Sequence, residues 1–120
     1  MIRDLTTKDL TAVNEIYNQA IDAKFSTAHT VHITMEERMA WFREHDQVNY
    51  PVYVWEENGV VAGWLSFSPY RKGRQALRSV AEISYYVHHV YHRRGIGRAL
   101  LDHAIKRAPE LNFKTLIAIL

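Results

Sequence analysis

The chain has 120 residues, 48% of them hydrophobic, and no cysteine, so it is expected to form one small globular domain without disulfides or a catalytic thiol. Its formal net charge is only +2, although basic residues gather at Arg71 to Arg78 and again at His88 to Arg98. No apolar run approaches the roughly 20 residues of a membrane span, and no signal peptide opens the chain, so we expect a cytoplasmic protein with no membrane contact. Aromatic residues of a single-strand groove are not interleaved with the basic clusters, which disfavours nucleic acid as a partner.

The first third of the chain predicts helices. Thr6 with Asp9, and Thr34 with Glu37, have the spacing of capping boxes and so predict two helix starts. Phe25 to Ile33 is predicted to be the loop between the helices. After the first start, apolar residues recur at helical spacing on one face: Val13, Ile16, Tyr17, Ala20 and Ile21. Ile2 to Asp4 is too short to assign.

The middle of the chain predicts strands. Val52 to Trp55 and Val60 to Phe67 flank Asn58-Gly59, a strong hairpin signal because a type I′ turn needs positive φ at both central positions. Val80 to Val87 is the next strand. Alternation along it predicts one face with Glu82, Ser84 and Tyr86 and an opposite face with Ile83, Tyr85 and Val87.

A helix and a final strand are predicted next. Pro109 should end the helix, since proline lacks the N–H that a helix interior needs. Thr115 to Leu120 is almost entirely apolar, as a buried central strand would be. The residues of the helix expected to face inward are Ala99, Leu100, Ala104 and Ile105.

The turn into that helix is the most informative feature of the sequence. Gly95 and Gly97 have no Cβ, so the backbone can approach a ligand closely. The free N–H groups at the start of a helix, with its positive dipole end, favour an anion. Arg93, Arg94 and Arg98 add positive charge around them. Together these features predict a pyrophosphate cradle, although Rossmann folds and P-loops use the same physics.

The sequence around the glycines excludes those two alternatives. Position 100 is leucine where a third Rossmann glycine would fall, and the P-loop lysine pattern is absent. The segment His92-Arg93-Arg94-Gly95-Ile96-Gly97 instead resembles the Gln/Arg-x-x-Gly-x-Gly/Ala motif of the GNAT acetyltransferases, with histidine at its first position. Glu57 to Gly63 and Glu82 to Val87 are similar to the phosphinothricin and methionine sulfoximine acetyltransferase subgroup.

This resemblance implies an α+β, three-layer fold: the GNAT acyl-CoA N-acyltransferase fold, a mixed and mostly antiparallel sheet flanked by helices. Residues 1–120 would form a single GNAT domain that stops after the fifth strand, without the C-terminal helix and last two strands of the family. Because an apolar strand edge promotes association, we expect residues beyond Leu120 or a second chain of a homodimer to cover it.

The resemblance also assigns roles to residues. Glu82 corresponds to the general base of the family, the alternative being a structural carboxylate paired with an arginine. Acetyl-CoA would be held by Arg93 to Arg98, with Ile96 among them, and by backbone N–H groups of Tyr85, Tyr86 and Val87. For the acid group of the acceptor we expect an arginine, because its planar fork binds oxyanions, and the candidates are Arg71, Arg74 and Arg78, with Arg78 the first choice.

We do not expect a metal. His88 and His89 would point to opposite faces of an extended chain, and no nearby carboxylate or cysteine completes a ligand set. The function predicted is therefore transfer of acetyl from acetyl-CoA to the α-amino group of a small amino acid or analogue, by direct attack in a ternary complex. The alternative is a non-catalytic acyl-CoA-binding or assembly module.

Overall fold

The computed structural model describes residues 1–24, 27, 29–70 and 78–118. Its elements follow one another as β1 (Ile2–Asp4), the 3-10 turn η1 (Thr7–Asp9), α1 (Leu10–Asp22), α2 (Met35–Glu44), β2 (Val52–Glu57), β3 (Val60–Pro69), β4 (Val80–Val87), the 3-10 turn η3 (His89–Tyr91), α3 (Ile96–Arg107) and β5 (Thr115–Ala118). None of the helices in these ranges is long and apolar enough to cross a membrane.

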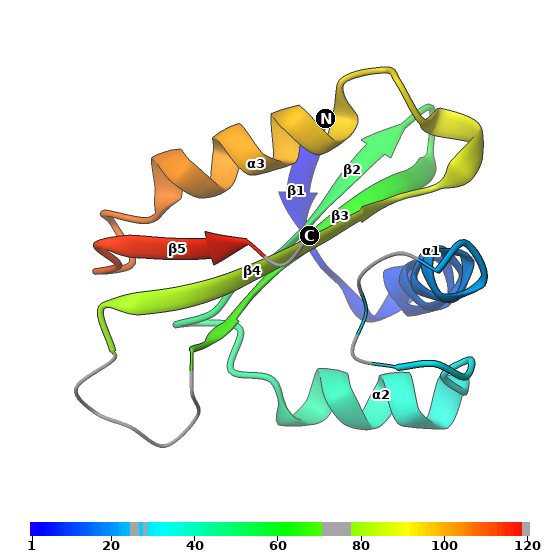
Figure 1. Ribbon diagram of the computed structural model, residues 1–120, viewed down its shortest axis with the longest axis horizontal. Coiled ribbons are helices and arrows are strands. Elements are labelled where there is room, and N and C mark those ends of the chain that lie inside the picture. The colour runs from blue at the N-terminus through cyan, green and yellow to red at the C-terminus, as the bar shows by residue number, and fades with distance from the viewer. Residues whose placement is uncertain (25–26, 28, 71–77, 119–120) are drawn as a thin grey trace.

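The strands form one sheet in the order β1-β2-β3-β4-β5. The first three pairings are antiparallel, and β5 runs parallel to β4. Helix α3 covers one face of the sheet, and α1 and α2 cover the other (Figure 1). The three-layer, mostly antiparallel architecture is therefore confirmed.

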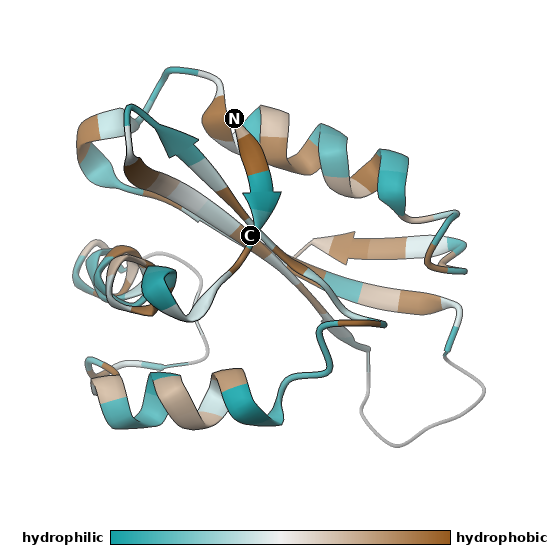
Figure 2. Cartoon of the chain, turned by 180° about the vertical axis from the view of Figure 1, so that it is seen from behind, coloured by the Kyte–Doolittle hydropathy of each residue, from teal (hydrophilic) through white to brown (hydrophobic). Residues whose placement is uncertain are grey.

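A separate hydrophobic core fills each side of the sheet. Phe67, Ile83 and Leu100 belong to the core under α3, whereas Ile16 and Trp64 belong to the core under α1 and α2. Figure 2 shows brown and teal segments alternating along the helices, the pattern of amphipathic helices that cover a sheet.

The local start and turn signals are confirmed. At the start of α2, the Glu37 N–H donates to Thr34 Oγ1 at 3.1 Å, and the Glu37 carboxylate accepts from the Thr34 N–H at 3.1 Å. Asn58 and Gly59 both have positive φ, 51° and 80°, as the predicted hairpin turn requires.

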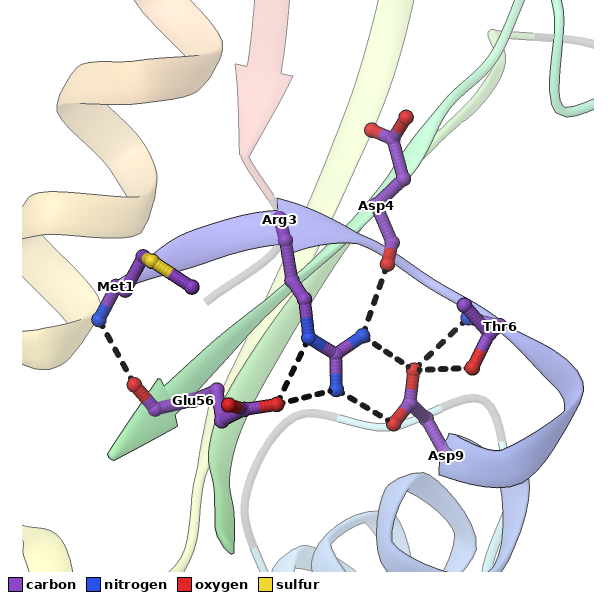
Figure 3. Close-up of polar contacts among 6 residues, drawn as sticks. All are labelled: Met1, Arg3, Asp4, Thr6, Asp9 and Glu56. Carbon is purple, nitrogen blue, oxygen red and sulfur yellow. Dashed lines mark hydrogen bonds and ion pairs between the residues drawn. The ribbon is translucent and has the colours of Figure 1, made fainter. Parts of the chain in front are cut away.

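An ion-pair network joins β1 to β2 and to the start of the first helix (Figure 3). The Arg3 guanidinium donates to both carboxylate oxygens of Asp9, at 2.8 and 2.9 Å, and to Glu56 at 2.9 Å. Asp9 also accepts from the Thr6 N–H at 2.8 Å. These hydrogen bonds, the one from Arg3 first, lower the pKa of Asp9. This arginine is therefore fully paired and structural.

One prediction about packing is wrong. Ile105 is 54% exposed, because it follows the buried Ala104 by one position and so lies on the outer side of α3. In β5, Leu116 and Ile117 are half-buried and Thr115 and Ala118 are exposed, and the described residues of this strand pair with β4 on one side.

Candidate functional site

Two cavities lie at β4 and involve its two faces. The first, here called the cradle cavity, has a volume of about 510 Å³ and is lined by residues of β4 and the α3 turn, among them Tyr85, Val87 and Gly97. The second, the α2 cavity, has a volume of about 690 Å³ and contains Glu82 and Ser84. The predicted alternation of side chains along β4 is thus confirmed, and Tyr86 lines both cavities.

The turn into α3 presents unpaired backbone donors. Gly95, the residue before the helix, has φ of +80° and no side-chain cap occupies the helix start. The first intrahelical bond runs from the Ala99 N–H to the Gly95 carbonyl at 3.0 Å, so the N–H groups of Ile96, Gly97 and Arg98 have no partner within the helix. Arg93 also has positive φ, 65°, an uncommon conformation for a non-glycine residue that is concentrated at ligand sites. This backbone fits an anionic ligand.

Gly97 has a packing role besides the one its spacing suggests. A Cβ at this position would lie 3.3 Å from Cε2 of Tyr85 and 3.7 Å from Cγ2 of Val87. The missing side chain therefore permits close packing of α3 on β4, and Gly97 also lines the cradle cavity with these two residues. At Gly95 a Cβ would meet nothing within 4 Å, so glycine is needed there for the positive φ.

The three arginines predicted for the cradle do not all lie at the cradle cavity. Arg93 and Arg98 line the cradle cavity. Arg94 does not: its guanidinium lies 3.7 Å from Glu57 and 5.2 Å from the ring centroid of Tyr91. Its charge is therefore directed to the hairpin between β2 and β3.

The register of β4 decides which of its backbone groups face away from β3. The His88 N–H donates to Ala62 of the β3 segment at 2.8 Å, and because hydrogen-bonded pairs alternate in an antiparallel ladder, Tyr86 also bonds β3. Tyr85 and Val87 then point their backbone groups away from β3. The described β4–β5 pairing ends at Ile83, so those groups lie beyond it. The backbone groups of Tyr85 and Val87 are thus directed away from β3, whereas those of Tyr86 bond β3, and the contact of these residues with acetyl-CoA stays a prediction.

The α1 residues of the cradle cavity were not predicted from the sequence, whereas His92 was expected to reach a phosphate of CoA or solvent. Gln19, Ala20 and Ala23 of the α1 end form one wall. His92 Nε2 donates to the Val87 carbonyl at 2.8 Å, so this ring nitrogen is directed at β4. No sequence signal links the end of α1 to a turn about seventy residues later.

The histidine pair also differs from prediction. The rings of His88 and His89 stack, with centroids 4.6 Å apart and planes 22° apart. They do not point to opposite faces, because the chain leaves the strand at Val87 and turns into η3. Over the described ranges there is no group of three side chains suited to hold a metal ion.

The predicted acceptor residues are only partly brought together. Glu82 is half-buried in the α2 cavity, and no described side chain forms an ion pair or hydrogen bond with it. Arg78 is exposed and lines neither cavity. Arg71 and Arg74 lie outside the described residues. Thr27, His29 and Ile33, from the predicted loop between the helices, do line the α2 cavity.

The main residue missed from the sequence is Arg38. It lies in α2, lines the α2 cavity and is buried. Hydropathy patterns place an arginine on the solvent side of a helix, so the sequence carried no signal for its burial.

Comparison with known proteins gives a family. The sequence pattern described as the acetyltransferase (GNAT) family matches residues 12–120. The YwnH protein of Bacillus subtilis (strain 168) is 41% identical over 114 residues, which cover 94% of this chain and 69% of YwnH.

Relatives with named substrates are similar over nearly the whole chain. The L-methionine sulfoximine/L-methionine sulfone acetyltransferase of Salmonella typhimurium (strain LT2) is 34% identical, with 98% of this chain and 68% of the relative covered. The structure of a GNAT superfamily phosphinothricin acetyltransferase from Sinorhizobium meliloti in complex with AcCoA superposes with a TM-score of 0.88 at 32% identity, covering 98% of this chain and 64% of that one.

Proposed function

The chain belongs to the acetyltransferase (GNAT) family, and on this premise we propose that it transfers acetyl from acetyl-CoA to the α-amino group of a small amino acid or analogue. The observation that carries the proposal is the arrangement around β4: Tyr86 lines both the cradle cavity and the α2 cavity. A co-substrate in one cavity and an acceptor in the other would meet at this strand.

In this proposal the cradle cavity binds acetyl-CoA. Its pyrophosphate would accept hydrogen bonds from the uncapped N–H groups of Ile96, Gly97 and Arg98, at the positive end of the α3 dipole. Arg93 and Arg98 would supply further positive charge. The outward N–H groups of Tyr85 and Val87 are the proposed donors to the pantetheine and the acetyl carbonyl, where negative charge develops during the reaction.

The acceptor is proposed to bind in the α2 cavity. Glu82 would take a proton from the ammonium group, directly or through a water, so that the amine can attack the thioester carbonyl. A C–N bond forms, the C–S bond breaks, and the CoA thiolate leaves and is protonated. The chain has no cysteine, so the acetyl group cannot pass through an acyl-cysteine. For the acceptor's acid group, Arg78, with Arg71 and Arg74, remains the candidate from the sequence, although Arg78 lines neither cavity.

A thiol-release assay tests the proposal. The protein is incubated with acetyl-CoA and a panel of amino acids that includes L-methionine sulfone, and free CoA is measured against a control without acceptor. We expect acceptor-dependent release and an N-acetylated product by mass spectrometry. Tight acetyl-CoA binding with no release above hydrolysis would contradict the proposal and favour a non-catalytic acyl-CoA-binding module.

We also propose a homodimer, as the resemblance implies, with the cytoplasmic location expected from the sequence composition. The half-buried Leu116 and Ile117 on β5 offer apolar surface for such a contact. Sedimentation of residues 1–120 tests it: a monomer with a cooperative melt would contradict the dimer.

A further inference from the structure

Arg38 is a buried cation with no counter-charge among the described residues. The residue is 4% exposed, and its Nε donates to Asn14 Oδ1 at 3.1 Å. The guanidinium carbon lies 4.9, 4.8 and 5.4 Å from the ring centroids of Tyr17, Trp41 and Trp64. No carboxylate in the described ranges forms an ion pair with it. Aromatic rings stabilise a cation only in part, so this arrangement calls for an anion.

Two hydrogen-bond donors beside the α2 cavity have no partner. Arg38 Nη2 and Trp64 Nε1 are both buried, and neither forms a hydrogen bond with a residue that the structure describes. Arg38 Nη1 also has none with any described residue. Both residues line the α2 cavity. Buried donors are nearly always paired, because an unpaired one loses its hydration without replacement. Two unpaired donors at one cavity therefore indicate a ligand that accepts hydrogen bonds.

Arg3 and Arg38 differ in their ionic partners: the half-buried Arg3 is paired with carboxylates, whereas the more deeply buried Arg38 is not. Arg3 hydrogen-bonds to Asp9 and Glu56, and its pKa is raised accordingly. Desolvation lowers the pKa of Arg38, because burial disfavours the charged form and no described carboxylate offsets it. An arginine keeps its proton even so. The fold thus maintains a positive charge in the α2 cavity at a cost in stability.

The remaining walls of the cavity complete a pattern of charge. Glu82 on β4 supplies a negative group, and Ser66, Ser68 and Ser84 supply hydroxyls. Glu37 and Glu44 line the cavity as well, but both are exposed, whereas Glu82 is half-buried. A buried cation together with a half-buried carboxylate matches a zwitterion, in which an acid group and an ammonium group are a few bonds apart.

We propose that Arg38 and Trp64 Nε1 form an oxyanion subsite that binds the acid group of the acceptor, with its amino group toward Glu82. The subsite restricts acceptors to amines that carry a carboxylate or a similar acid, and it disfavours esters and decarboxylated amines. It rests on the proposed acceptor site in the α2 cavity. Arg38 is a specificity-determining residue in this scheme, distinct from the arginines of the 71–78 segment.

Tryptophan fluorescence tests the subsite without turnover, because Trp41 and Trp64 surround the guanidinium. The protein is titrated with L-methionine sulfone and with its methyl ester, which keeps the amino group and removes the negative charge. We expect the ester to bind on the order of ten- to a hundredfold more weakly, the range for hydrogen bonds to a charged group. Equal affinities, or no response to either compound, would overturn the subsite.

Variants then identify the arginine responsible. Arg38→Met keeps an apolar chain of similar length and should remove most of the preference for the acid over the ester. Arg43→Met, an exposed arginine of the same helix that lines neither cavity, is the matched control and should keep it. Arg78→Met tests the arginine favoured from the sequence for the acid group, and its preference is compared with that of Arg38→Met. A folded Arg38→Met protein with the full preference would overturn the proposal.

Folding of the variant is not essential to the test. If Arg38→Met does not fold, the same binding test is made with Arg38→Lys, because lysine keeps the positive charge but lacks the planar guanidinium group that forms two parallel hydrogen bonds. That variant should retain part of the preference, and an undiminished preference would count against Arg38. Preference for the acid without thiol release would refute only the proposed function. Thiol release with equal use of amino acids and decarboxylated amines would refute only the subsite.

Discussion

Across β4, the cradle cavity offers its ligand mainly backbone groups, whereas the α2 cavity offers side chains. In the cradle cavity the donors are N–H groups of the α3 start and of Tyr85 and Val87. In the α2 cavity they belong to Arg38, Trp64 and the serines. Backbone donors are the same for any side chain, so a site of this kind can keep one ligand while the sequence varies. Side-chain donors change with each substitution, and acceptor choice is therefore expected to reside on the α2 side.

The comparison predicts its largest effect at Glu82, on the side-chain face. Glu82→Gln keeps the shape and the hydrogen bonds but removes the basic group, so the acetyl-transfer rate should fall by a factor on the order of 10² to 10⁴. Acetyl-CoA affinity, measured by calorimetry, should stay nearly unchanged because the cradle cavity does not contain this residue.

A second carboxylate provides the control for this prediction. Glu44 is exposed at the edge of the same α2 cavity, and Glu44→Gln should affect the rate far less. If the two variants were equally active, Glu82 would be a structural residue, and a group other than Glu82 would have to accept the proton of the ammonium group.

The second-largest effect is expected in the cradle cavity, where the ligand is held mainly by backbone groups. Gly97→Val would force its Cβ against Tyr85, which lies 3.3 Å away, and push α3 from β4. Misplacement of the donors by about 1 Å can cost a factor of about 10², so we expect acetyl-CoA affinity to drop by about a hundredfold in a protein that still melts cooperatively. Unchanged affinity would mean that the cradle has been assigned to the wrong turn.

Gly95 separates packing from backbone conformation within the cradle. Gly95→Ala adds a Cβ that meets nothing within 4 Å, but its φ of +80° strains any other residue. We expect a loss of unfolding free energy of about 1 to 2 kcal/mol with a smaller loss of acetyl-CoA affinity than in Gly97→Val. A larger affinity loss here than at Gly97 would reverse the roles of the two glycines.

The Arg3 network, remote from both cavities, should affect stability alone. Asp9→Asn removes the charged acceptor of two Arg3 hydrogen bonds and should cost about 2 kcal/mol of unfolding free energy at pH 7. The folded-state pKa of Asp9 is lowered, so its contribution is present above the ordinary aspartate pKa of about 3.9 and is lost as the pH falls through the folded-state value.

Urea titrations at several pH values measure this contribution. The gap between parent and variant should narrow below about pH 4, while acetyl-CoA affinity at pH 7 stays that of the parent. A gap that is constant down to pH 2 would show that the carboxylate charge is not what stabilises the network.

The sequence by itself determined the turns and helix starts that depend on residues close together in the chain. Asn58-Gly59 forms its turn because only those residue types accept the required φ, and Thr34 with Glu37 caps a helix three residues away. The motif around Gly95 predicts an anion cradle because glycines, arginines and a helix start are adjacent in the chain. The family resemblance to GNAT acetyltransferases followed from the same segments.

Only the tertiary structure decided what depends on contacts between distant segments. Tyr85 meets Gly97 because α3 packs on β4, and Gln19 enters the cradle wall because the end of α1 approaches it. Ile105 is exposed because α3 packs on β2, β3 and β4 through the side that carries Leu100 and Ala104. Arg38 lies among Tyr17, Trp41 and Trp64, which come from α1, α2 and β3. Burial and pairing of a charge are properties of the assembled neighbours, and no spacing along one helix encodes them.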